Sequence, residues 1–344
     1  MNAPRGRIVR RPVHGVLLLD KPLGWSSNDA LQKVKWLLGA EKAGHTGTLD
    51  PLATGVLPLC FGAATKFSQL QLEADKSYEA KLKLGEKTTT GDAEGDVLEK
   101  REVNVTQADL DRVAPQFLGA IRQTPPMYSA LKKDGKALYE YARAGVDVER
   151  ESRPITIYKL NMCLSHEEPA QPAIKMVVTC SKGTYIRTLG EDIGEALGCG
   201  AHLSALRRVG TGGFAESQCV TLEALEAMTD DQRLAHVQPV DSLLADHTVI
   251  DLDSDNAGRF LSGLRRCGNW PDAAAVAVYG PALTSPDSPA AAAPTRRLLG
   301  VGHVKAGELV PGRLLSPIEV EEASQQQEQS QQRRFAGVQQ ISKI

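Results

Sequence analysis

Residues 44–58 constrain the local fold more than any other stretch of this 344-residue chain. They contain three glycines, two prolines and a single carboxylate, Asp50. The glycines permit backbone angles that other residues avoid, and Pro51 favours an extended conformation at Asp50, because its ring clashes with a helical preceding residue. The sequence therefore predicts a loop of fixed shape. Two interpretations of Asp50 stay open, a catalytic carboxylate and a structural aspartate that caps the following turn.

The composition is that of an ordinary globular protein, with 42% hydrophobic and 24% charged residues. The length is sufficient for two domains. A formal net charge of -2 argues against a wholly basic, histone-like protein, but basic residues cluster near residues 5–11, 132–136, 143–153 and 207–208. A near-neutral sum can conceal a positive face that binds a polyanion.

The six cysteines are scattered, and no cysteine or histidine spacing is typical of a zinc site. We interpret most of them as reduced core thiols, and we expect no metal and no cofactor. No apolar run reaches the length of a signal peptide or a transmembrane helix. The sequence therefore predicts a cytoplasmic protein without membrane association.

Periodicity predicts the main elements of the first two-thirds of the chain. A buried strand is expected at residues 14–20, and alternation predicts strands at residues 77–84 and 173–180. Tyr78 begins the apolar face of the second strand, where it is either a core tyrosine or an aromatic that faces a ligand. Helices are expected from Ser27 or Asn28 to Gly39, and from Thr106 to residue 118. Residues 85–99 are expected to form a polar loop.

Two further features indicate an anionic ligand. Within residues 123–154, the stretch at residues 123–136 is basic and carries two prolines near its start, which is typical of a mobile lid over a polyanion. An ordinary surface insertion is the alternative. Arg187 falls in the first turn of the helix that follows residue 184, where its charge opposes the helix dipole. It therefore requires an anionic partner, from the protein or from a ligand.

The last third of the chain changes character near residue 248. Short strands separated by glycine turns predict a small β-barrel. We expect the segment at residues 281–294, rich in Pro, Ser and Ala, to be a disordered excursion, and the Gln-rich end of the chain to be a disordered tail.

Several of these segments together resemble the TruB family of stand-alone bacterial tRNA pseudouridine synthases. The similar segments are residues 18–27, 44–58, 62–66, 76–80, 125–132, 181–189 and 202–208. They follow the order found in the family and extend over residues 14 to about 215. The excursion and the Gln-rich tail are departures from the family pattern.

The resemblance implies an α+β pseudouridine synthase fold, with a mixed, largely antiparallel sheet flanked by helices and a small C-terminal PUA-like β-barrel. The domains expected from it are a catalytic domain at residues 14–248 and a PUA-like RNA-binding domain at 249–316, and residues 123–154 correspond to the RNA-gripping thumb. Composition adds a basic flexible arm at residues 1–13 and a disordered tail at residues 317–344.

The resemblance also implies roles for individual residues. Asp50 becomes the catalytic aspartate, and Arg187 pairs with it. The residues expected to bind or support the flipped nucleotide are His45, Tyr78, Tyr185, Leu206, Arg187 and Lys21, with Lys21 supporting the loop from behind. Arg207 and Arg208 are expected to contact phosphates.

The implied reaction detaches uracil at N1 and reattaches it through C5 at uridine 55 in the T loop of tRNA. One carboxylate can suffice, because the departing uracil returns as the nucleophile. Asp50 either attacks C1′ or removes a proton from C2′, and both routes stay open. The expected partner is the T arm of tRNA, with no obligate protein partner. The alternatives are a guide-RNA-dependent synthase of the Cbf5/dyskerin kind and a protein that is mainly a tRNA-folding chaperone.

Overall fold

The computed structural model describes residues 10–165, 172–281 and 296–341. Most of the predicted basic arm and nearly all of the predicted excursion at residues 281–294 lie outside these ranges. No helix in the described ranges is both long and apolar enough to cross a membrane.

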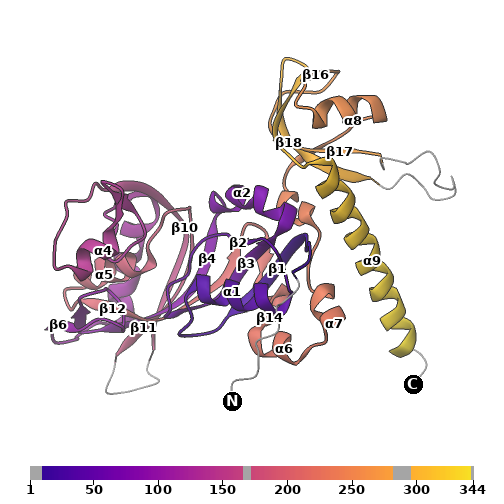
Figure 1. Cartoon of the computed structure of the whole chain (residues 1–344). Helices are drawn as coiled ribbons and strands as arrows, with labels where there is room; N and C mark the ends of the chain where they lie inside the picture. Colours follow the sequence, from indigo (N-terminus) through magenta and orange to yellow (C-terminus); the bar gives the residue numbers. More distant parts are fainter. Residues whose placement is uncertain (1–9, 166–171, 282–295, 342–344) are drawn as a thin grey trace.

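A large mixed sheet forms the centre of the molecule (Figure 1). Its strands run in the order β14-β1-β3-β12-β4-β11-β10-β7, with β2 beside β3 and β13 beside β12. Only β1 with β14 and β3 with β12 are parallel among its pairs in the described residues. The strands are β1 (Gly15–Lys21), β2 (Ala43–His45), β3 (Ala53–Phe61), β4 (Lys76–Leu84), β7 (Gly119–Gln123), β10 (Arg153–Ser165), β11 (Ala173–Cys180), β12 (Ala201–Thr211), β13 (Phe214–Ala215) and β14 (Val220–Thr221). The predicted α+β fold with a mixed, largely antiparallel sheet is confirmed.

Helices pack on the apolar face of this sheet. On β4, the side chains of Tyr78, Ala80 and Leu82 are buried, while Glu79 between them is exposed, as alternation predicts. These buried residues share one core with apolar residues of α1 (Ser27–Leu37) and α5 (Ile186–Ala196). The smaller helices of this part are α2 (Ser68–Leu72), α3 (Gln107–Val113), α6 (Leu222–Ala227) and α7 (Asp230–Ala235), with 3-10 turns at Gly62–Lys66 (η1), Ala114–Phe117 (η2), Glu216–Gln218 (η3) and Val240–Leu244 (η4).

The helix boundaries differ slightly from those predicted. Ser26, one residue before the predicted caps, accepts the backbone N–H of Asp29 with its hydroxyl, so α1 begins at Ser27. Thr106 caps α3 as predicted: its hydroxyl accepts the N–H of Asp109, and the carboxylate of Asp109 accepts the N–H of Thr106. The α-helix ends at Val113, and the chain continues as a 3-10 turn that contains Pro115.

Two insertions extend from the sheet. The hairpin of β5 (Glu86–Thr88) and β6 (Val97–Lys100) replaces much of the polar loop expected at residues 85–99. The segment between β7 and β10 holds β8 (Lys132–Lys133), β9 (Lys136–Ala137) and α4 (Leu138–Arg143). We call this segment, residues 123–154, the thumb.

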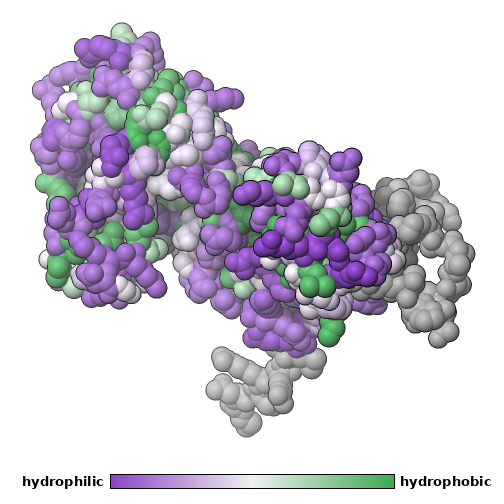
Figure 2. All heavy atoms as spheres, turned by 90° about the horizontal axis from the view of Figure 1, so that it is seen from above, coloured by the Kyte–Doolittle hydropathy of each residue, from purple (hydrophilic) through white to green (hydrophobic). Residues whose placement is uncertain are grey.

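A second, five-stranded sheet follows in the order β15-β17-β18-β19-β16. Its elements are β15 (Thr248–Asp251), α8 (Ser254–Leu261), β16 (Arg266–Cys267), β17 (Ala273–Gly280), β18 (Arg297–Lys305) and β19 (Glu308–Leu314). The predicted small β structure at the C-terminal side is confirmed. It is a half-barrel rather than a closed barrel, because no pairing of β15 with β16 closes the sheet in the described residues. Figure 2 shows this part and the thumb side as two lobes whose surfaces are mainly hydrophilic.

The two parts share a hydrophobic core. Val16, Leu18 and Cys60, on the face of β1 and β3 away from α1, join a cluster with Phe260 of α8 and Val278 of β17. The predicted boundary near residue 248 therefore separates two sheets and does not separate two independent cores.

The prediction of a disordered tail from residue 317 is wrong for most of its length. Residues Pro317–Ile341 form the helix α9, which extends from the second sheet toward α7 (Figure 1). Val320 is buried, and Glu319 lies 2.6 Å from the ammonium group of Lys66. Gln326 exchanges two hydrogen bonds with the backbone of His14. Because glutamines surround these residues, the sequence gives no sign that they anchor a helix.

Candidate active site

The loop that carries Asp50 is fixed by hydrogen bonds from neighbouring elements. The hydroxyl of Ser27 accepts the N–H of Leu49 at 2.8 Å and donates to its carbonyl at 3.0 Å. The carbonyl of Asp50 accepts from the N–H of Ala53, and that of Pro51 accepts from the N–H of Gly24. The backbone on both sides of Asp50 is therefore held, while its carboxylate is 44% exposed.

Arg187 pairs with Asp50. Its Nη2 lies 3.0 Å from Oδ2 of Asp50, and its Nη1 lies 3.5 Å from Oδ2 of Asp92. The same guanidinium donates to the carbonyls of Thr90 at 3.0 Å and Tyr128 at 2.7 Å. Only 7% of the Arg187 side chain is exposed, so four acceptors orient a buried cation. The position of Arg187 at the start of a helix predicted an anionic partner, and the structure provides two, Asp50 and Asp92.

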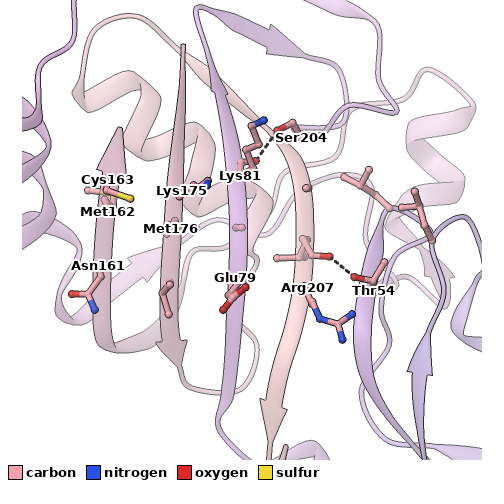
Figure 3. Close-up of a pocket in the computed structure, with 16 residues that line it drawn as sticks. Thr54, Glu79, Lys81, Asn161, Met162, Cys163, Lys175, Met176, Ser204 and Arg207 are labelled. Atoms are coloured by element: carbon pink, nitrogen blue, oxygen red, sulfur yellow. Dashed lines mark hydrogen bonds between the residues drawn. The ribbon is translucent and has the colours of Figure 1, made fainter. Parts of the chain in front are cut away.

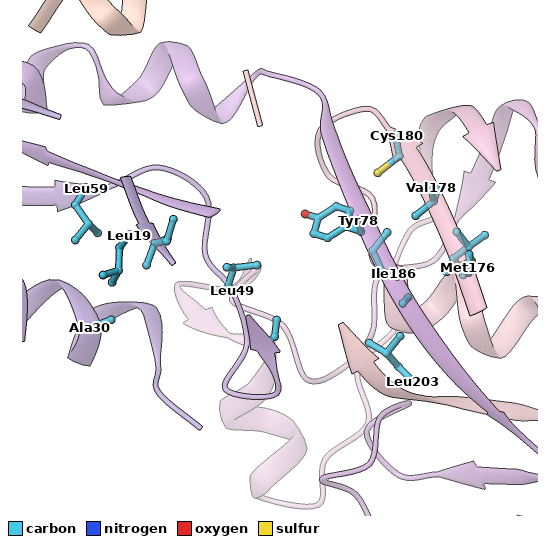
Figure 4. Packing of buried hydrophobic residues seen from close by; sticks show 14 of the residues in the cluster. Leu19, Ala30, Leu49, Leu59, Tyr78, Met176, Val178, Cys180, Ile186 and Leu203 are labelled. Carbon is cyan, nitrogen blue, oxygen red and sulfur yellow. The ribbon is translucent and has the colours of Figure 1, made fainter. Parts of the chain in front are cut away.

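A cavity of about 360 Å³ opens beside this ion pair. Its lining includes Asp50, Tyr78, Tyr185, Arg187 and Leu206, which come from the loop, from β4, from the start of α5 and from β12. Figure 4 shows Tyr78 extending from β4 toward the loop that carries Leu49. Burial raises the pKa of the Tyr78 hydroxyl, so it stays protonated at neutral pH. The cavity therefore combines a carboxylate, a cation and aromatic surface.

Lys21 lies behind the loop and is not among the residues that line this cavity. Its side chain is fully buried, and its ammonium group donates to the carbonyls of Pro22 at 3.0 Å and Trp25 at 2.6 Å. Burial lowers its pKa to about 8, although the nearby carboxylate of Asp50 favours the charged form. Its ammonium group therefore lies near the Asp50 carboxylate without lining the cavity.

His45 is likewise absent from the cavity lining. It belongs to β2, and its Nδ1 is buried without a hydrogen-bond partner among the described residues. Burial, followed by the charge of Arg208, lowers its pKa below the ordinary value. The ring therefore lies outside the cavity that Asp50, Tyr78 and Arg187 line.

Arg208 is not exposed on the surface for contact with the RNA backbone, because its side chain is almost completely buried and reaches only the wall of the cavity beside Asp50. Its guanidinium donates to the carbonyl of Val56 at 2.7 Å and to that of Gly47 at 3.1 Å. Arg208 thus supports the Asp50 loop from within. Arg207 remains partly exposed, but it pairs with Asp20 at 2.8 Å and with Glu216 at 2.9 Å.

A larger hollow, of about 710 Å³, lies on the face of the sheet opposite to the side chain of Tyr78 (Figure 3). Its lining includes Glu79, Lys81 and Val177, which alternate with the buried residues of β4 and β11. It contains neither Asp50 nor Arg187. We therefore place the candidate active site in the smaller cavity, where charged and aromatic groups converge.

Three contributors were not identified from the sequence. Asp92 belongs to the segment expected to be a polar loop, yet only 3% of its side chain is exposed. The sequence predicts Ser27 only as a helix cap. It predicts Gln123 only as the start of the thumb, whereas its side chain bonds the backbone of Tyr185. The role of each residue depends on a partner that is distant in the sequence, and the periodicity of a segment does not indicate such a partner.

Two family models match the chain. One, described as the TruB family pseudouridylate synthase (N terminal domain), matches residues 35–186. The other, described as the tRNA pseudouridylate synthase B C-terminal domain, matches residues 187–245. Asp50 and Tyr78 fall in the first match, and Arg187 is the first residue of the second.

Curated relatives are similar over nearly the whole chain. The tRNA pseudouridine synthase B of Verminephrobacter eiseniae (strain EF01-2) is 61% identical over 332 residues, which cover 95% of this chain and 97% of the relative. That of Ralstonia pickettii (strain 12J) is 56% identical over 308 residues, which cover 89% and 95%. Among solved structures, a chain in a crystal structure of a Cbf5–Nop10–Gar1 complex is 25% identical, with a TM-score of 0.65 and coverage of 93% of this chain and 92% of that chain.

Proposed function

The chain belongs to the TruB family of pseudouridylate synthases, and on this premise we propose that it converts uridine 55 in the T loop of tRNA into pseudouridine. It is a tRNA pseudouridine synthase, an isomerase. The observation that carries the proposal is the ion pair of Asp50 with the buried Arg187, beside a cavity lined by Tyr78.

We propose Asp50 as the catalytic residue. The N1–C1′ bond of the uridine breaks, a bond from C5 to C1′ forms, the proton on C5 is lost and N1 gains a proton. Asp50 acts either by attack on C1′ or by removal of the C2′ proton. Both routes require a carboxylate of fixed orientation, which the contact with Arg187 supports.

The target base must leave its stack to reach Asp50. Extrusion costs a few kcal/mol, which stacking and pocket contacts offset. Tyr78 offers a flat surface for the flipped uracil, and Tyr185 and Leu206 offer further walls. We propose that His45 and Lys21 act from the rear of the loop, where His45 supports its shape and Lys21 contributes a positive charge near Asp50.

RNA binding extends beyond this cavity. The lysines of the thumb, Lys132, Lys133 and Lys136, are exposed and suited to phosphates of the T arm. We propose that residues 14–248 form the catalytic domain and that residues 249–316 act as a PUA-like RNA-binding domain. Since tRNA is the proposed substrate, we also propose a cytoplasmic location.

Release of tritium from tRNA labelled at uracil C5 tests the proposal. Wild-type protein alone, without guide RNA or partner proteins, should release tritium from a normal tRNA transcript and not from one with cytidine at position 55. Asp50→Asn should bind the tRNA and release none.

Equal release by wild type and Asp50→Asn would remove Asp50 as the catalyst. A requirement for guide RNA would instead support a synthase of the Cbf5 kind.

A further inference from the structure

Gln123 makes an unusual pair of hydrogen bonds to one residue of the active site. It is the last residue of β7, and only 4% of it is exposed. Its Oε1 accepts the backbone N–H of Tyr185 at 2.8 Å, and its Nε2 donates to the carbonyl of Tyr185 at 3.0 Å. A single side chain thus holds both polar groups of the residue that caps α5.

The two bonds differ in importance. The carbonyl of Tyr185 also accepts the N–H of Leu189 in the first turn of α5, so it keeps a partner without Gln123. The N–H of Tyr185 donates to the buried Gln123, and loss of this acceptor leaves a partly buried polar group without a partner. The acceptor atom of Gln123 therefore matters most for the backbone at Tyr185.

This backbone leads directly to the catalytic pair. The side chain of Tyr185 lines the cavity, and Arg187, two residues later, pairs with Asp50. Arg187 also donates to the carbonyl of Tyr128, which lies five residues after Gln123 in the thumb. The base of the thumb therefore contacts the start of α5 at two points, Tyr185 and Arg187.

We propose that Gln123 is a positioning residue for catalysis, which sets Tyr185 and Arg187 in place and thereby fixes the orientation of Asp50. This inference rests on the proposed function, because its effect is on the uridine-to-pseudouridine step. It acts through the backbone of Tyr185 and requires no contact between Gln123 and RNA. Loss of the amide should consequently slow the chemical step and leave tRNA affinity unchanged.

The test compares Gln123→Met with wild type in single-turnover tritium release, with enzyme in excess over labelled tRNA. Methionine preserves the length of the side chain and removes both hydrogen bonds. The saturated rate constant should fall by about 10- to 100-fold, because small displacements of catalytic groups have effects of that size. The dissociation constant for tRNA, measured by filter binding, should not change.

Gln71→Met is the matched control. Gln71 is also a buried glutamine that donates to a backbone carbonyl, that of Leu243, but it contacts neither the thumb nor α5. Its replacement should leave the rate constant unchanged. A second variant, Gln123→Glu, retains an acceptor for the N–H of Tyr185. Its rate relative to wild type should rise as the pH is lowered, because protonation removes the negative charge that would otherwise face the carbonyl oxygen of Tyr185 and displace this backbone.

The possible results distinguish a failure of the proposed function from a failure of the positioning role of Gln123. Absence of tritium release by wild type contradicts the proposed function itself. Normal release by wild type with an unchanged rate constant in Gln123→Met overturns the positioning role. A loss explained by weaker tRNA binding, or failure of both Gln123 variants to fold, assigns Gln123 a purely structural role and also overturns the proposal.

Discussion

Arg187 joins two segments that are distant in the sequence, the loop of Asp50 and the turn that carries Asp92. Both carboxylates lie within 3.5 Å of its guanidinium, but Asp92 is buried and Asp50 is partly exposed. Asp92 also accepts the hydroxyl of Thr90 and the N–H of Glu94. One carboxylate is thus fixed in the interior and the other is left accessible to a substrate.

Asp92→Asn should therefore slow the reaction without weakening tRNA binding. The amide keeps the shape but lacks the charge that holds Arg187, and a loss of about 10- to 100-fold in the single-turnover rate corresponds to roughly 1.4–2.7 kcal/mol. Tritium release measures the rate, and filter binding measures affinity. The exposed Asp96 of the same turn provides the control, and an equal effect of Asp96→Asn would contradict the role of Asp92.

His45 should make the stability of the protein depend on pH. Its pKa in the folded protein is lowered from 6.5 by burial, so the unfolded chain binds the proton more readily. The free energy of unfolding should then fall as the pH drops below about 6.5. Denaturant unfolding at about pH 7.5 and about pH 5.5 should show a smaller difference in His45→Gln than in wild type. His303→Gln, which changes an exposed ring, should match wild type.

The sequence allowed some site residues to be predicted and concealed others. Asp50 and Arg187 were recognisable because their local settings were unusual, a carboxylate before proline and a cation at a helix start. Asp92 and Gln123 were concealed, because burial and partners depend on distant segments. Arg208 was expected at the surface together with Arg207, since adjacent arginines resemble a basic patch even when β12 buries one of them.

At the scale of elements, the close contact of β3 with β12 brings the Asp50 loop and Arg208 together. Gly55 has a φ of +97°, and a Cβ there would lie 2.2 Å from the carbonyl oxygen of Arg208. The two strands are parallel at this point, with Gly55 opposite Arg208. Gly55 therefore provides both the predicted backbone freedom and the space for two strands to approach closely.

Gly55→Ala should destabilise the protein by about 3 kcal/mol, because it adds a clash and backbone strain. Denaturant unfolding measures the change. Gly44→Ala, in β2, should change stability by no more than about 0.5 kcal/mol, because nothing lies within 4 Å of its added Cβ. Similar losses in the two variants would contradict the packing argument.

The elements themselves were largely predictable. Alternation identified β4 and β11, and the cap at Thr106 identified the start of α3. The failure at α9 has a physical cause. A polar helix with few apolar positions has no clear periodic signal, and its order comes from tertiary contacts such as those of Val320, Glu319 and Gln326.

At the scale of the whole molecule, the large mixed sheet and the half-barrel are held as one body by their shared core and by α9. Lys66, in the 3-10 turn after β3, contacts both Glu319 of α9 and the carbonyl of Leu314 at the end of β19. His14, before β1, contacts Glu322 at 3.0 Å. These contacts join the first and last parts of the described chain. Such pairing is not predictable from one sequence, because each partner resembles an ordinary surface residue.

Truncation separates the contribution of α9 from that of the half-barrel. A chain that ends at Ser316 loses Val320 from the core, together with the contacts to Lys66 and His14. The free energy of unfolding should fall by about 2–4 kcal/mol, of which burial of Val320 supplies roughly 1.5–3 kcal/mol. A chain that ends at Ser330 keeps all of these contacts and should unfold like the full-length protein. If both truncated chains were as stable as the full-length protein, α9 would not hold the two sheets together.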